Sequence, residues 1–354
     1  MENQHIRLKG CKFIDWLLAP LLLVGFLLVG CDQIQRLLAP LPSVDDDDTV
    51  KIGFIYTTPN RLNSRYGAEL AANELNEEGG VRGTLIELVP HGVPTQRLLS
   101  ENISDTEYVA GITEELITKD GVTAITGPNR STHAVIVGEI AQRHGIPMIT
   151  TGATNPSVTA AGDFIFMAAF TDDFQGKVMA QFAVEDLEAK TAAVLTHTGD
   201  VYSEGLSKTF IANITAYGGE VVAEQFYMAG DTDFTAQLTA ISVAAPDVVF
   251  ITGFIPELPL VVRQARVEIG ITATFLGGDS WDNPGLIPEA GTAVDGSFFS
   301  SPFSVKANPV DLGEDARRFI SAYTGTFNEV PDGGAALGYD AVRLLVQAMR
   351  RASD

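Results

Sequence analysis

The chain has 354 residues, which is long enough for two domains, because single hydrophobic cores rarely grow beyond ~250–300 residues. Its apolar fraction of 45% and its charged fraction of 19% are ordinary for a globular protein. The formal net charge of −22 argues against nucleic-acid binding, which requires basic surface to neutralise phosphates.

The first thirty residues have the features of an export signal. Basic residues precede a largely apolar run from 16 to 29, and Cys31 follows a small-residue pattern at the end of that run. An apolar run of about 14 residues is short for a membrane-spanning helix, which needs about 20. Residues 1–30 are therefore predicted to be a lipoprotein signal peptide and Cys31 to be the lipidation site. The alternative is a signal-anchor helix.

Residues 31–49 are predicted to be an extended acidic linker that begins at the lipid anchor. They contain two prolines and the run of aspartates at 45–48, so they bury little surface and repel one another. Cleavage after residue 30 would remove Cys11 and leave Cys31 without a partner for a disulfide.

An alternation of apolar runs and helical segments begins at residue 50. Its first series has expected strands at 50–56, 85–90, 124–126 and 148–151, and expected helices at 66–78, at 106–119 and from 131 onward. Its second series has expected helices at 174–187, 202–217, 234–243 and 258–269, and expected strands at 192–196, 221–226, 248–252 and 274–276. Strands that alternate with helices imply βαβ units and parallel sheets. The two series predict an α/β protein with two Rossmann-like lobes.

Two small-residue turns follow neighbouring strands of the first series. One spans 127–130 and leads into a helix at Ser131; the other spans 152–156 and contains Thr154. The carboxyl ends of parallel strands are where open α/β folds bind ligands, and free backbone N–H groups at a helix start suit an anion such as a carboxylate. Ser131 and Thr154 each add a hydroxyl group. Alternatively, Ser131 is only a helix N-cap and Thr154 only a turn residue.

The segment GPNRSTHAVIVGEIAQRHGIPMITTGATNPSVT at 127–159 resembles the core of the Leu/Ile/Val-binding protein family, the type I periplasmic binding proteins of ABC importers. The similarity covers roughly residues 50 to 350 and continues through YGAELAANELNEEGGVRG, THTGDVYSEGL, DFTAQLTAI, GFIPELPLVVRQARVEIGI and FLGGDSWDNP. It implies an N-lobe of residues 50–170 plus 301–354, a C-lobe of residues 171–300, and a hinge of crossing segments near 168–172 and 297–303. The ligand would lie between the lobes.

The carboxyl end departs from the family pattern. Expected helices at 312–327 and 335–351 return to the first lobe, after which the family continues with a further strand and a third crossing. This sequence stops at Asp354. It is expected either to be truncated or to lack the last crossing, and the hinge would then be looser.

The resemblance also implies which residues bind a free amino acid. Ser131 and Thr154 match positions that hold the ligand carboxylate, and Gly152, which is followed by Ala153 in the same turn, supplies a carbonyl for the ammonium. Asp279, from the other lobe, matches the acid that binds the ammonium; alternatively it caps a helix.

Three further side chains are candidates for the cleft. Tyr202 matches a tyrosine that lies against the ligand, and Phe254 occupies a cleft loop; both could instead be core aromatics. Arg130 departs from the small or apolar residue that is frequent at its position. It could pair with an acidic ligand, but we expect it to be a solvated surface charge.

Enzyme signatures are missing from the sequence. No G-x-G-x-x-G or Walker loop follows the strands that end near 56 and 126, and no H-E-x-x-H or C-x-x-C is present. His133 lies on a different face of its helix from Ser131 and so cannot easily activate it. No catalytic residue, cofactor or metal is expected.

The expected function is that of a substrate-binding lipoprotein of an ABC importer, which binds an amino acid of branched-chain type or a similar small zwitterion. Its expected partners are the ligand, an ABC permease and, through the lipid, a membrane, and the protein is expected to be exported and monomeric. The alternative is a sensing or envelope scaffold protein that binds a small amide or another metabolite without transport.

Overall fold

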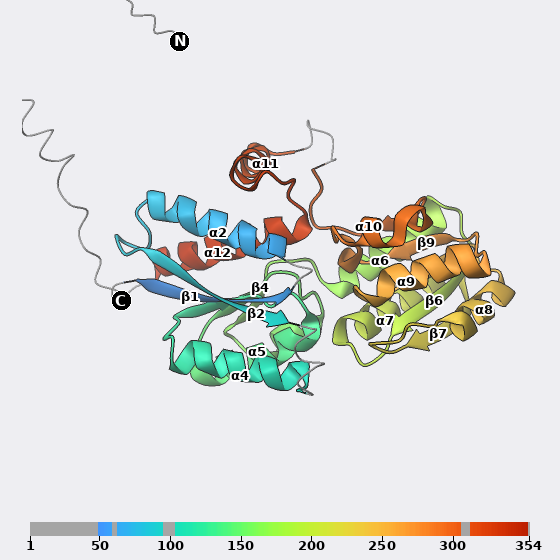
Figure 1. Cartoon of the computed structure of the whole chain (residues 1–354), viewed down its shortest axis with the longest axis horizontal. Helices are drawn as coiled ribbons and strands as arrows, with labels where there is room; N and C mark the ends of the chain where they lie inside the picture. Colours follow the sequence, from blue (N-terminus) through green and yellow to red (C-terminus); the bar gives the residue numbers. More distant parts are fainter. Residues whose placement is uncertain (1–48, 59–61, 95–102, 306–311, 353–354) are drawn as a thin grey trace, which may run out of the picture. The chain divides into compact units, whose positions relative to one another are not determined.

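The computed structural model describes residues 49–58, 62–94, 103–305 and 312–352. The predicted signal peptide, Cys31 and the linker up to residue 48 lie outside the described residues. From Thr49 to the carboxyl end the chain forms one compact unit that contains two five-stranded parallel sheets (Figure 1). Within the described ranges, no helix has the length and apolar character to cross a membrane.

The first sheet has the strand order β2-β1-β3-β4-β5. Ile52 of β1 pairs with Ala124 of β3, and Ile125 pairs with Met148 of β4. Central strands of this kind form because their residues are apolar on both faces. The strands are β1 (Val50–Thr58), β2 (Ile86–Pro94), β3 (Ala124–Thr126), β4 (Met148–Thr150) and β5 (Ile165–Met167).

Helices cover both faces of the first sheet (Figure 1). Phe54 faces the core formed with α2 (Leu62–Glu77) and α12 (Gly333–Arg351), whereas the next residue, Ile55, faces the core formed with α4 (Asp105–Thr118) and α5 (Ser131–His144). Two glycines let α2 and α12 approach closely, because a Cβ atom on Gly67 would lie 1.9 Å from the Ala335 carbonyl oxygen and one on Gly338 would lie 2.0 Å from that of Ser64.

The second sheet has the strand order β10-β9-β8-β6-β7. Val194 of β6 faces a core with α6 and α7, and Leu195 faces the opposite core with α8 and α9. The strands are β6 (Thr191–His197), β7 (Glu220–Tyr227), β8 (Val248–Ile251), β9 (Thr274–Gly277) and β10 (Phe298–Phe299). The helices are α6 (Asp172–Glu185), α7 (Val201–Ala216), α8 (Thr235–Ala244) and α9 (Glu257–Arg263).

The chain passes from the first domain to the second between β5 and α6, and it leaves β10 for α11 (Glu314–Phe327). Phe319 and Tyr323 of α11 pack in the same core as α2 and α12, so α11 belongs with the first sheet. The predicted α/β class with two parallel-sheet domains is therefore confirmed.

Several boundaries differ from the sequence-based expectation. Strands β5 and β10 were not expected, because they expose Phe166, Phe298 and Phe299 and so lack a fully buried apolar run. The helix expected at 258–269 is α-helical only to Arg263 and continues as a π-helical turn from Gln264 to Ile269.

Candidate functional site

The loops after β3 and β4 meet at Ser131. Ser131 is the first residue of α5, and its buried hydroxyl accepts a hydrogen bond from the Asn155 N–H group at 3.3 Å. Arg130 occupies the N-cap position of α5 and makes no side-chain capping bond. The alternative that Ser131 serves only as an N-cap is therefore wrong.

Thr154 joins this loop pair to the first turn of α6. Its hydroxyl donates to Asp172 Oδ1 at 2.6 Å, and the Asp172 N–H group donates to the Thr154 carbonyl at 2.9 Å. A hydroxyl has one hydrogen and two lone pairs. Because that hydrogen is committed to Asp172, the Thr154 hydroxyl offers an acceptor, and not a donor, to any further partner.

Asp279 lies at the end of β9 in the second domain, and 8% of it is exposed. It starts the short 3-10 helix Asp279–Trp281, of which Gly278 is the N-cap residue, so Asp279 is not the cap. Its Oδ1 atom accepts from Gln175 Nε2 at 3.1 Å, and the same Nε2 atom lies 3.4 Å from the Thr154 hydroxyl oxygen. One nitrogen atom thus contacts a candidate residue from each domain.

Gly152 and Ala153 face different environments. Gly152 lines a cavity of about 10 Å³ together with Asn129, Asp279 and Asp282, which is room for about one water molecule. Ala153 is fully buried in the core between the first sheet and α5. An amino acid is far larger than this cavity, so binding here requires the lining residues of the two domains to separate.

Tyr202 and Phe254 pack against each other with ring centroids 5.3 Å apart. The Tyr202 hydroxyl donates to Ser280 Oγ at 3.2 Å and accepts from the Ser280 N–H group at 3.3 Å. Burial, followed by the negative charge of Asp279, raises the pKa of Tyr202 well above 10. Tyr202 therefore stays neutral and fixes the loop that carries Asp279.

The expectation that Arg130 is a solvated charge is wrong. Its Nη2 atom bonds Asp200 Oδ2 at 3.1 Å, and its guanidinium carbon lies 4.5 Å from the centroid of the Phe254 ring. The Arg130 side chain is 19% exposed and that of Asp200 is 2% exposed. Asp200 begins α7 of the second domain, so Arg130 connects the two domains and does not face solvent.

Sequence reasoning missed Asp172 and Gln175. Burial raises the pKa of Asp172 to about 7; the hydrogen bond from Thr154 lowers it, and the charge of Asp279 raises it further. Gln175 is 1% exposed and bonds both Asp172 and Asp279. The signal for these two residues was weak, since polar residues in the first turn of a helix usually cap it or face water.

Two other side chains near the site, those of His133 and Trp281, contact protein atoms. His133 Nε2 lies 3.0 Å from Asp105 Oδ2, so its ring does not reach toward Ser131 as a base would. Trp281 is buried, and its indole N–H group donates to the Ile251 carbonyl at 3.0 Å, so it packs against protein. Among the residues with described positions, no group of three or more His, Cys, Asp or Glu could hold a metal ion.

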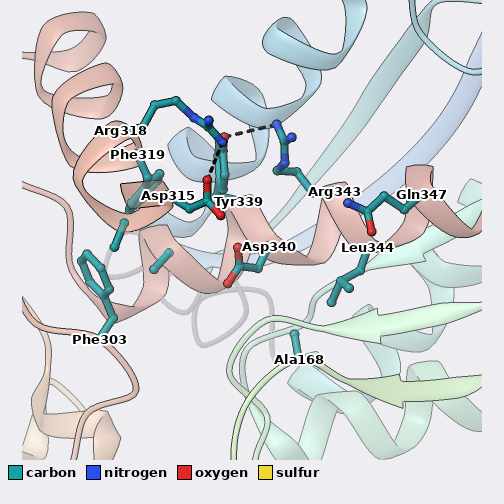
Figure 2. Close-up of a pocket in the computed structure, with 12 residues that line it drawn as sticks. Ala168, Phe303, Asp315, Arg318, Phe319, Tyr339, Asp340, Arg343, Leu344 and Gln347 are labelled. Carbon is teal, nitrogen blue, oxygen red and sulfur yellow. Dashed lines mark hydrogen bonds and ion pairs between the residues drawn. The ribbon is translucent and has the colours of Figure 1, made fainter. Parts of the chain in front are cut away.

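A larger cavity, of about 500 Å³, lies between α11, α12 and Ala168 (Figure 2). None of the predicted site residues lines it. Three of its charged side chains form ion pairs, Arg318 with Asp315 at 3.0 Å and Arg343 with Glu74 at 3.3 Å. It is therefore a weaker candidate for a charged ligand than the loops that carry Ser131, Thr154 and Asp279.

Two parallel-sheet domains, with polar side chains converging from the strand ends of both, define the class of two-domain binding proteins. Residues 49–354 match the family model described as periplasmic binding protein. The chain is 28% identical over 292 residues to the leucine-, isoleucine-, valine-, threonine- and alanine-binding protein of Pseudomonas aeruginosa, which covers 82% of this chain and 74% of that protein.

Two solved structures are similar over most of their length. A leucine-binding protein from Thermotoga maritima is 36% identical, with a TM-score of 0.76, 86% of this chain covered and 83% of the other. The branched-chain amino acid transporter substrate-binding protein of Streptococcus pneumoniae, solved with isoleucine, is 32% identical, with a TM-score of 0.77 and coverage of 86% and 85%. The chain belongs to the Leu/Ile/Val-binding family of type I periplasmic binding proteins.

Proposed function

We propose that the protein is the substrate-binding component of an ABC importer and binds an amino acid of branched-chain type, or a similar small zwitterion, between its domains. The observation that carries this proposal is the convergence of Thr154 and Asp279, one from each domain, on a single nitrogen atom of Gln175. The named binding functions of its relatives support the class of ligand.

In the proposed complex, the ligand carboxylate lies against the Ser131 hydroxyl and the backbone N–H groups at the start of α5, where the helix dipole favours an anion. The ammonium donates to the Gly152 carbonyl and the Asp279 carboxylate. The family resemblance assigns Thr154 to the ligand carboxylate, but because its hydroxyl donates to Asp172, we propose that its oxygen accepts from the ammonium instead. Charge-assisted hydrogen bonds of this kind contribute roughly 1.5–3 kcal/mol each when they are buried. Tyr202 and Phe254 lie on the second-domain side of the ligand.

The proposal includes the location of the protein. Export, lipidation of Cys31 and the acidic linker would hold the binding domains at a membrane beside the permease, as a monomer. The protein would act by binding and release, without catalysis and without a cofactor. The proposed lobe boundaries remain 50–170 plus 301–354 and 171–300.

Calorimetric titration of the purified protein with the twenty amino acids tests the proposal. A ligand at 100 times its dissociation constant should also stabilise the fold by about 2.7 kcal/mol. Ser131→Ala and Asp279→Asn should each weaken binding about tenfold or more. The same substitutions at the exposed residues Ser242 and Asp295 serve as controls. Binding that survives unchanged in both site variants would contradict the proposed site.

A further inference from the structure

Gln175 is the most connected buried polar side chain near the candidate site. It lies in the first turn of α6, and its carboxamide touches segments from both domains. The Nε2 atom donates to Asp172 Oδ1 at 3.0 Å and to Asp279 Oδ1 at 3.1 Å, and it lies 3.4 Å from the Thr154 hydroxyl oxygen. The Oε1 atom accepts from Ser300 Oγ at 2.8 Å and from the Asp279 N–H group at 3.1 Å.

These contacts require an amide at this position. The Asp279 N–H group donates to Gln175 Oε1, and the Asp279 carboxylate accepts from Gln175 Nε2. A carboxamide supplies both the acceptor and the donor that these two bonds need. A carboxylate could not donate to Asp279, and an aliphatic side chain could neither donate nor accept. Gln175 thereby fixes both the backbone and the carboxylate orientation of Asp279.

The same carboxamide connects Asp279 to the chain that leaves the second sheet. Ser300 directly follows β10, and its neighbour Ser301 donates to Asp282 Oδ2 at 2.8 Å. The Gly333 N–H group at the start of α12 donates to the same Asp282 oxygen at 2.9 Å. Hydrogen bonds of Gln175 with Ser300, and of Asp282 with Ser301 and Gly333, therefore connect Asp279 through the segment 300–301 to the first domain.

We propose that Gln175 is a positioning residue for ligand capture, which holds the Asp279 carboxylate opposite Thr154 and ties it to the segment that returns to the first domain. This inference rests on the proposed function, because it assumes that Asp279 binds the ligand ammonium. Without the Gln175 amide, Asp279 would have to be ordered by the ligand itself, and affinity would fall.

The test is a double-mutant cycle measured by calorimetric titration with L-leucine, L-isoleucine and L-valine at pH 7.5. Gln175→Leu should weaken binding about tenfold or more in the wild-type background. In the Asp279→Asn background it should cost far less, because the carboxylate that it positions is gone. In the Ser131→Ala background it should retain its full effect. Gln181→Leu, the same change on the exposed face of α6, is the control.

A second variant separates positioning from simple loss of packing. Gln175→Glu puts a third carboxyl beside Asp172 and Asp279, which should weaken binding relative to wild type at pH 8. At pH 5 the introduced carboxyl can be protonated and donate again, so affinity relative to wild type should recover, whereas Gln175→Leu should show no such recovery. Asp172, whose pKa burial raises to about 7, also titrates in this range, but it is present in wild type and in both variants, so the comparison of Gln175→Glu with Gln175→Leu isolates the introduced carboxyl. Tyr202 stays neutral throughout this pH range.

Ser300→Ala removes one acceptor contact of Gln175 and keeps the carboxamide, so it should weaken binding only a few-fold. If Gln175→Leu does not fold, binding by Ser300→Ala tests the positioning role instead. Wild-type affinity in Gln175→Leu, strictly additive effects with Asp279→Asn, or unchanged binding in Ser300→Ala would each overturn the positioning role while the proposed function stands. A wild-type protein that binds none of the three amino acids would overturn both.

Discussion

Arg130 and Asp200 form an ion pair between the two domains, with Nη2 and Oδ2 3.1 Å apart. The Thr132 hydroxyl donates to the same Asp200 oxygen at 3.0 Å, and the Phe254 ring lies against the guanidinium. Burial by itself would raise the pKa of Asp200, but Arg130 and the Ser203 N–H group outweigh it and hold the pKa below its usual value. The pair thus stabilises the contact between α5 and α7 beside the candidate site.

Arg130→Gln should lower the free energy of unfolding by about 3 kcal/mol, because it leaves the Asp200 carboxylate buried without its counter-charge. Urea unfolding monitored by circular dichroism measures the loss. Arg143→Gln is the matched control on the same helix; Arg143 pairs with Glu114 at the surface, so its loss should cost under about 1 kcal/mol. Equal costs for the two variants would contradict a stabilising role for the interdomain pair.

Asp172→Asn should change how stability depends on pH. Because the folded-state pKa of Asp172 is raised to about 7, the native state holds a proton that the unfolded chain releases near pH 4. Wild-type stability from this group is therefore full below about pH 4 and falls as the pH rises to about 7. Between pH 4 and pH 8 the free energy of unfolding of Asp172→Asn should therefore rise relative to that of wild type by up to about 4 kcal/mol.

Urea unfolding at half-unit pH steps measures this difference. Asp173→Asn, the same substitution at an exposed position in the same helical turn, provides the control. If Asp172→Asn follows the wild-type curve at a constant offset, Asp172 does not titrate in this range.

His133→Gln should remove a loss of stability on the acid side. Burial lowers the pKa of His133, although the hydrogen bond with Asp105 opposes this effect. Below about pH 6.5 the unfolded chain therefore binds a proton that the native state does not bind, and wild-type stability falls as the pH drops. Gln can still donate to Asp105, so the variant should keep this contact. Its free energy of unfolding should no longer fall with decreasing pH because of this residue. The check is the same unfolding series between pH 5 and pH 7.5.

Gly277→Ala should destabilise the second domain by about 1–3 kcal/mol. A Cβ atom on Gly277 would lie 2.2 Å from the indole nitrogen of Trp281, which is held by its hydrogen bond to Ile251. Gly325→Ala is the matched opposite, because Gly325 lies in α11 with open space around it; it should stabilise the fold by ~0.5–1 kcal/mol. Differential scanning calorimetry compares the two, and equal shifts would rule out the proposed clash.

The fold was largely predictable from sequence, because its central strands are apolar runs and its helices repeat apolar residues at helical spacing; α5 also ends at a glycine, Gly145. Strand β3 and the start of α5 at Ser131 lie where the sequence places them. Strands β5 and β10 were missed because they lie at the edges of their sheets and expose side chains, so they lack the fully buried apolar run that marks β3 and β4. Pairing with β4 and β9, and not their own sequence, defines these two strands.

The candidate site was only partly predictable. Ser131, Thr154 and Asp279 were identified through turns at strand ends and through the family resemblance, and their role as ligand contacts stays a prediction. Gln175 was missed because its partners are contributed by distant segments, which a helical pattern cannot reveal. Arg130 was misjudged for the same reason, since its counter-ion, Asp200, lies seventy residues further along the chain.

Trp281 is the single tryptophan of the described chain, and it lies two residues after Asp279 with its indole fixed in the second-domain core. Indole emission responds to the polarity and charge of its surroundings. A change at Asp279 would therefore be visible as an optical signal without any attached dye. Trp281 is thus an intrinsic fluorophore beside the proposed ligand contact, where a label-free amino-acid sensor would need one.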